Sequence, residues 1–184
     1  KSIKSEAKES EEILKTIAIR RDNLKLSLLK LERQKEKKDE KRKLFQIKKE
    51  NIPLKAQVLV YPWIDGKLNN PSIEKNGQGF LLEKETMFWF QEQYTPRSED
   101  RCVPEISPCY ENDFSGLAPA FIITAQYDPL LDDGFKYHQQ LKTAGNKTRY
   151  CEYKEMFHGF FSLPLMHPLA MQTYSDIQQF LKEL

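Results

Sequence analysis

An aspartate and a histidine stand out in this sequence because each follows an apolar run of strand-like composition. Asp128 comes directly after AFIITAQY (120–127), and His158 follows RYCEY (149–153) after a short loop. In an open parallel sheet, the loops at the carboxyl ends of neighbouring strands collect catalytic and ligand-binding groups. A carboxylate that accepts the N–H of an imidazole fixes its tautomer and stabilises the cation formed when the histidine acts as a base. The spacing therefore predicts an acid–base pair of Asp128 and His158.

Each of these residues also has a simpler interpretation. An aspartate before a proline is a common turn former, which fits Asp128 without any chemistry. A single histidine near a loop is more often a surface or packed residue, which fits His158. His138 and His167 are both expected to be surface residues. The neighbouring acids Asp132 and Asp133 suit the first turn of a helix, where negative charge favours the helix dipole.

The elements that would position the pair begin after Pro53. Short apolar runs predict three strands, at 56–61, 120–124 and 149–153. Runs of helix-forming residues predict helices at 83–94, 131–143 and 170–184, while 63–82 and 95–119 are expected to form turns and loops. This alternation predicts an α/β fold with a short, mostly parallel sheet flanked by crossover helices.

The first part of the chain has a different character. Residues 1–55 contain 18 basic and 10 acidic residues, a net charge of +8, whereas residues 56–184 contain 11 and 17, a net charge of −6. In the stretch ERQKEKKDEKRK (32–43), eleven of twelve residues are charged, so it has no apolar face to bury. We therefore expect a long charged helical segment over 1–51 and a separate α/β domain over 52–184.

Several protein classes are excluded. No apolar run approaches the roughly 18 to 20 residues that span a bilayer, and the opening KSIKSEAKESEE lacks the apolar stretch of a secretory signal. The three cysteines, Cys102, Cys109 and Cys151, have neither zinc-site spacing nor an even number. We expect no transmembrane segment, no metal or cofactor, and a cytoplasmic location. The chain opens with Lys rather than Met, which leaves open whether other residues precede it.

Five short blocks follow one another in an informative order: QVLVYP (57–62), SP (107–108), SGLAPA (115–120), DPLLDDG (128–134) and MFHGF (156–160). Together they resemble the C-terminal portion of the hormone-sensitive-lipase-like carboxylesterases, over residues 52–184. The resemblance implies a partial α/β-hydrolase fold and hydrolysis of short or medium acyl esters, with water as second substrate. It also implies that Asp128 is the acid of a catalytic triad and His158 its base.

The sequence departs from that family at the nucleophile. The family carries its serine on a G-x-S-x-G turn between a strand and a helix, but no such motif occurs here and the first glycine is Gly66. Residues 16–19 (TIAI) resemble the end of the strand before this turn, and residues from Asn23 onward resemble its helix. We therefore hypothesise that residues 1–51 hold a remnant of this unit and that activity is impaired. Ser27, the nearest serine, has no glycine beside it.

Other functions stay open. The chain could be a non-catalytic interaction module whose basic segment contacts an acidic partner, although Phe45 is the only aromatic residue before Tyr61, which argues against specific nucleic-acid binding. Residues 1–50 could also be out-of-frame or chimeric sequence.

A sheet of so few strands would leave an unpaired edge, at which a second copy or a partner chain could pair. Residues 87–90 (MFWF) could line an acyl pocket, but core packing is the favoured interpretation.

Overall fold

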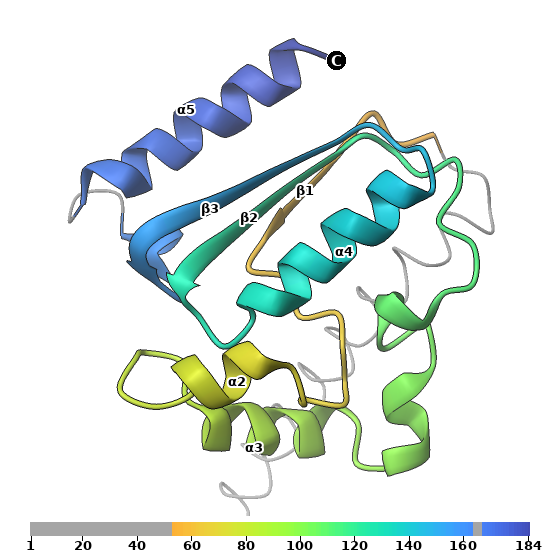
Figure 1. The fold of residues 1–184 in the computed structure, drawn as a ribbon, viewed down its shortest axis with the longest axis vertical. Coiled ribbons are helices and arrows are strands. Elements are labelled where there is room, and N and C mark those ends of the chain that lie inside the picture. Colours follow the sequence, from red (N-terminus) through yellow and green to blue (C-terminus); the bar gives the residue numbers. More distant parts are fainter. Residues whose placement is uncertain (1–52, 164–166) are drawn as a thin grey trace, which may run out of the picture. The chain divides into compact units, whose positions relative to one another are not determined.

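A computed structural model describes residues 53–163 and 167–184. The expected charged helix over 1–51 and the strand-like residues 16–19 lie outside the described residues. The elements are β1 (Gln57–Val60), α2 (Pro71–Asn76), α3 (Lys84–Tyr94), β2 (Ala120–Tyr127), α4 (Leu131–Thr143), β3 (Thr148–Phe157) and α5 (Pro168–Lys182) (Figure 1). Short 3-10 turns occur at Ser98–Cys102, Pro108–Tyr110 and Phe160–Ser162.

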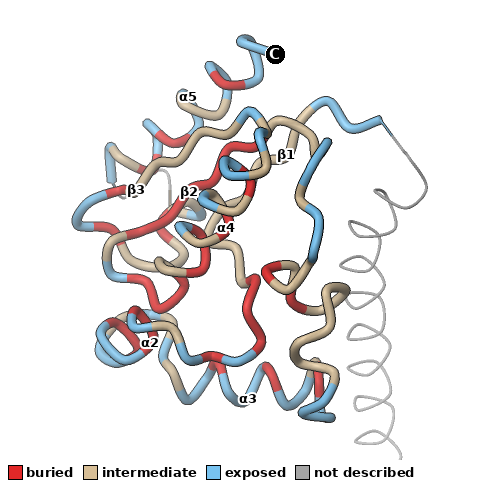
Figure 2. The backbone as a smooth tube through the Cα atoms, turned by 45° about the vertical axis from the view of Figure 1, so that its right-hand side comes forward, coloured by how far each residue is buried: buried red, intermediate tan, exposed pale blue. Residues whose placement is uncertain are grey.

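The three strands form one parallel sheet in the order β1-β2-β3. The central strand β2 is the apolar run AFIITAQY, and its residues 120–125 are all buried (Figure 2). A strand that is buried over six successive residues suits a sheet covered on both faces. The predicted α/β fold with a short, mostly parallel sheet is confirmed.

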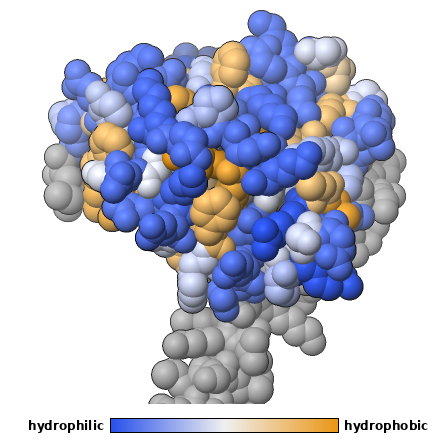
Figure 3. All heavy atoms as spheres, turned by 60° about the horizontal axis from the view of Figure 1, so that its bottom comes forward, coloured by the Kyte–Doolittle hydropathy of each residue, from blue (hydrophilic) through white to orange (hydrophobic). Residues whose placement is uncertain are grey.

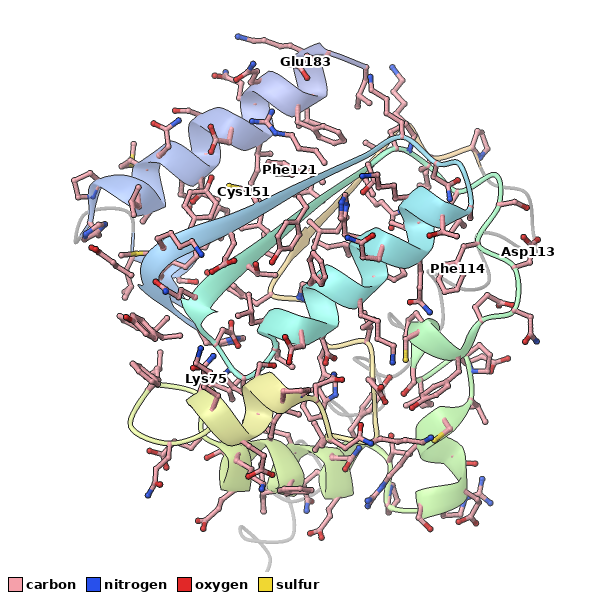
Figure 4. All side chains as sticks on the ribbon, viewed as in Figure 1. Lys75, Asp113, Phe114, Phe121, Cys151 and Glu183 are labelled. Atoms are coloured by element: carbon pink, nitrogen blue, oxygen red, sulfur yellow. The ribbon has the colours of Figure 1, made fainter. Side chains whose placement is uncertain are left out.

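Alternate residues of β2 face two separate clusters, because successive side chains of a strand point to opposite faces. Phe121 and Ile123 pack in the cluster that includes Phe180 of α5, whereas Ile122 packs in the cluster that includes Leu141 of α4. The helices α4 and α5 accordingly lie on opposite sides of the sheet (Figure 1). Phe121 and Cys151 are seen on the side that carries α5 (Figure 4). All three carboxyl ends of the strands thus meet at one edge of a sheet with both faces covered.

The helices predicted at 83–94 and 131–143 are confirmed as α3 and α4. The helix α2 contradicts the expectation of turns throughout 63–82. Its first residue, Pro71, has a φ angle already suited to the first turn, but six residues are too few to show helical periodicity in the sequence. The third strand is longer than expected, because β3 continues through Phe157.

The prediction that residues 87–90 pack in the core is wrong for three of the four. Met87 is fully buried, but Phe88, Trp89 and Phe90 are 38%, 55% and 47% exposed. Figure 3 views the side on which α2 and α3 lie and shows apolar side chains scattered among hydrophilic ones. Among the helices of the described residues, none combines the length and apolar character that crossing a membrane requires.

Candidate active site

Asp128 directly follows β2 and is completely buried. Its Oδ1 accepts a hydrogen bond from the backbone N–H of Leu130 at 2.8 Å. Its backbone carbonyl accepts a hydrogen bond from the side-chain amide of Asn76 in α2 at 3.1 Å. The turn into α4 thereby holds the carboxylate in place and leaves Oδ2 for a further partner.

His158 directly follows β3, and an irregularity in that strand sets its position. Between the pairs Ala125↔Tyr153 and Tyr127↔Phe157 the register shifts, so β3 contains two residues more than β2 over this span. Within the bulge, Glu155 has a φ of +63° and donates its N–H to the Gln126 side chain at 2.8 Å. A bulge of this kind changes the direction of a strand and re-aims the side chains beyond it.

The structure brings the two predicted residues together. Nδ1 of His158 lies 2.8 Å from Oδ2 of Asp128. The Asp128 side chain is 1% exposed and that of His158 is 26% exposed, so the imidazole connects a buried carboxylate with solvent. Because an ionised carboxylate can only accept, Nδ1 of His158 carries the proton of a neutral ring and Nε2 is left to accept one. This arrangement can hold and deliver a proton at Nε2.

Tyr61 is a third residue at this edge, and the sequence analysis missed it. Its ring lies 4.7 Å from the His158 ring between centroids, and its hydroxyl accepts the backbone N–H of Phe161 at 2.6 Å. Burial is the main cause that raises the pKa of Tyr61 to about 12, so the hydroxyl stays neutral at physiological pH. Since Tyr61 follows β1, the rule that selected Asp128 and His158 from their strand ends could have found it.

A second polar network fixes the segment after β1 against α4. As expected, Asp132 and Asp133 lie in the first turn of α4, but their contacts extend beyond the helix dipole. Asp133 accepts the backbone N–H groups of Ile64 at 2.9 Å and of Asp65 at 3.0 Å, and burial raises its pKa to about 6. Asp132 accepts the backbone N–H of Ser72 in α2 at 2.7 Å.

Asp65 completes this network. Burial acts to raise the pKa of its carboxyl, but the ammonium of Lys136 at 2.9 Å and other donors outweigh burial, and the pKa is lowered. The donors include the Tyr110 hydroxyl at 2.8 Å and the Lys67 N–H at 2.9 Å. Because these carboxylates are fully engaged in local contacts, the network is structural.

The two other histidines lie apart from the pair. Nδ1 of His138, within α4, lies 3.1 Å from the Thr148 hydroxyl, and the ring is half-buried rather than fully on the surface. His167 is exposed and caps the N-terminus of α5, where its Nδ1 accepts the N–H of Leu169 at 3.2 Å. All three cysteines are unpaired. In residues 53–163 and 167–184 no group of three or more metal-ligating side chains could hold an ion.

Comparison with known proteins places this chain in a family. Residues 29–162 match a family model described as alpha/beta hydrolase fold. The ethyl acetate hydrolase of Pseudomonas putida is 40% identical over 91 residues, which cover 50% of this chain and 29% of that protein. The carboxylic ester hydrolase LipN of Mycobacterium tuberculosis is 39% identical over 108 residues, covering 58% of this chain and 29% of LipN.

Solved structures of esterases superpose on the same part of the chain. A hyperthermophilic esterase from the archaeon Pyrobaculum calidifontis superposes with a TM-score of 0.71 at 30% identity, over 78% of this chain and 48% of the esterase. The carboxylesterase EstE1 from a metagenomic library gives a TM-score of 0.68 at 30% identity, over 71% of this chain and 45% of EstE1. The matched region is thus less than half of each of these proteins. The chain belongs to the α/β-hydrolase fold family, in the hormone-sensitive-lipase-like branch that its motifs resemble, and it corresponds to a part of the longer esterases.

Proposed function

We propose that this chain carries the acid and base of a carboxylesterase-type site for short or medium acyl esters, with His158 as base and Asp128 as its orienting acid. The observation that carries the proposal is the 2.8 Å contact between His158 Nδ1 and the buried Asp128 carboxylate. The two matched relatives named as ester hydrolases support the choice of substrate class.

In this mechanism Nε2 of His158 accepts a proton from the attacking hydroxyl, which belongs to a serine or to water. Asp128 stabilises the imidazolium that forms, and His158 then returns the proton to the departing alkoxide. The free electron pair of the hydroxyl forms the new bond to the acyl carbon, and the ester C–O bond breaks. If the hydroxyl belongs to water, the acid forms directly. If it belongs to a serine, a water molecule then attacks the acyl-enzyme, its proton passes through His158 to the serine oxygen, and the acid is released. Neither path uses a cofactor or metal.

The sequence supplies the base but no G-x-S-x-G nucleophile. We therefore propose that these 184 residues are impaired alone and that full activity needs a serine from outside them. Residues 1–51 are proposed to retain part of the nucleophile strand–helix unit. The start of the family match at residue 29 supports this for the second half of the segment.

Two further proposals concern the free edge of the sheet and the location of the protein in the cell. Among the described residues β1 pairs with β2 alone. We propose that the other edge of β1 pairs with a further strand, which could come from this polypeptide, from a second copy or from a partner chain. A cytoplasmic location is proposed because unpaired thiols such as the three found here are typical of reducing compartments.

The alternative function is a binding module without turnover. The observation in its favour is the net charge of +8 over residues 1–55. Binding to a polyanion such as heparin that weakens steeply between 50 mM and 200 mM salt, in a chain without esterase activity, would favour this alternative.

The proposal is tested by hydrolysis of p-nitrophenyl butyrate by the purified chain. We expect slow release of p-nitrophenol that falls to the buffer rate in His158→Ala, because the imidazole is the proton acceptor. His138→Ala is the matched control and should keep the wild-type rate. Equal rates in wild type and His158→Ala, in proteins that both melt cooperatively, would contradict the proposal.

A further inference from the structure

Tyr61 contacts three residues of the segment that carries His158. Its ring lies 4.7 Å from the His158 ring, tilted by 48°, and 5.6 Å from the Phe160 ring at 66°. Its hydroxyl accepts the N–H of Phe161 at 2.6 Å. Val58 and Val60 of β1 pack against the core cluster that contains Phe160, and Tyr61, directly after β1, adds a ring contact to His158 and a hydrogen bond to Phe161.

The backbone of Tyr61 supports a role beyond packing. Tyr61 has a φ of +43°, in the left-handed region that bulky residues rarely adopt. Its N–H still donates to the Ile123 carbonyl of β2 at 2.8 Å, so the sheet holds the residue in this conformation. Backbone strain of this kind persists where the surroundings over-determine it, often at functional sites.

We propose that Tyr61 is a positioning residue for His158, an inference that rests on the proposed acid–base function. Asp128 holds one edge of the imidazole through Nδ1, which still allows the ring to swing about that hydrogen bond. The Tyr61 ring blocks that swing from the side, and its hydroxyl holds the loop at Phe161, three residues further on. Asp128 thereby sets the tautomer, and Tyr61 sets where Nε2 points.

Gly159 allows the sharp turn that brings the residues after His158 close to Tyr61. It has a φ of +89°, and a Cβ atom placed on it would lie 3.1 Å from Cδ2 of Leu81. The chain therefore turns sharply directly after His158, which brings Phe160 and Phe161 back toward Tyr61. The turn needs a residue that tolerates positive φ, and the tyrosine then holds it from the opposite strand.

The test observes the His158 imidazole directly by nitrogen and proton NMR, at a pH where the ring is neutral. In wild type we expect the ring to be locked with its proton on Nδ1. Tyr61→Leu removes both ring and hydroxyl, and we expect His158 to keep its proton on Nδ1 but to average between ring orientations. Tyr61→Phe keeps the ring and should keep the locked tautomer, while the Phe161 amide exchanges with solvent about 3-fold to 10-fold faster, as expected for one lost hydrogen bond.

Tyr174→Phe is the matched control. Its ring stacks on Phe161 at 4.4 Å and its hydroxyl donates to the Phe161 carbonyl at 3.1 Å, so it contacts the same loop without contacting His158. A locked His158 in Tyr61→Leu, or equal loosening in Tyr174→Phe, would overturn the positioning role. If the wild-type ring itself shows no proton held on Nδ1, the acid–base pair fails instead, so the two failures are distinguishable.

Discussion

At the scale of single residues, the contrast between two buried aspartates shows how one chain uses carboxylates for different ends. Asp128 is held by a single backbone N–H and keeps one oxygen for His158. Asp65 is surrounded by donors from Lys136, Tyr110 and Lys67, and it stabilises the loop after β1. The first carboxylate is arranged to act on an imidazole that solvent can reach, whereas the second is saturated.

The Asp65–Lys136 contact predicts a pH-dependent stability. Lys136→Met should lower the free energy of unfolding at pH 7 by about 1 to 2 kcal/mol, because the carboxylate is buried while the ammonium is partly solvated. Since the pKa of Asp65 is lowered in the folded protein, its contribution is present above the unfolded pKa of about 4 and is lost as the pH falls through the folded value. The difference between wild type and variant should therefore shrink below about pH 4.

Urea unfolding at a series of pH values measures this difference. Lys154→Met is the matched control, because Lys154 pairs with Glu152 on an exposed part of β3 and its loss should change stability by less than about 1 kcal/mol. A Lys136→Met difference that stays constant down to pH 3 would show that the Asp65 carboxylate is not the partner that matters.

At the scale of elements, the bulge in β3 positions His158, and the tight turn after β2 positions Asp128. The register shift between Ala125 and Tyr127 makes room for Glu155 at positive φ. The side chain of Gln126 satisfies the Glu155 N–H that the ladder no longer pairs. The two extra residues bend the strand at this point, and the bend sets the direction in which the side chains beyond it point.

The strain at Glu155 predicts a stabilising substitution. Glu155→Gly should raise the free energy of unfolding by about 0.5 to 1 kcal/mol, because glycine adopts positive φ without the steric cost of a Cβ atom. Glu152→Gly in the regular part of the same strand should instead lower it by a similar amount. Urea midpoints of the two variants provide the comparison, and a loss of stability in Glu155→Gly equal to that in Glu152→Gly would refute the strain argument.

At the scale of the whole molecule, sequence reasoning found the parts that depend on local pattern. The apolar runs predicted β1 and β2, a run of helix-forming residues predicted α4, and the strand-end rule brought Asp128 and His158 together. The short helix α2 and the bulge in β3 escaped because neither has a periodic signature. The Tyr61 contact with Phe161 joins residues 100 positions apart, and only the assembled sheet edge makes it visible.

The family match covers a larger share of this chain than of its relatives. The fold match rests on about 130 residues of this chain (29–162), but the curated relatives are matched over 29% of their own length. Asp128 and His158 are held by contacts within the described residues, from β2, β3, α2 and Tyr61, so the geometry of the pair does not depend on a nucleophile turn.

The measurement that tests the central claim most directly is a double-mutant cycle on p-nitrophenyl butyrate hydrolysis, with Asp128→Asn, His158→Ala and the double variant. Because Asp128 acts through His158, we predict that the double variant hydrolyses the ester at the same residual rate as His158→Ala. Asp128→Asn alone should lower the wild-type rate, since the imidazole loses its carboxylate partner. A double variant whose losses multiply, or an Asp128→Asn variant as fast as wild type, would contradict the account of Asp128 and His158 as one acid–base unit.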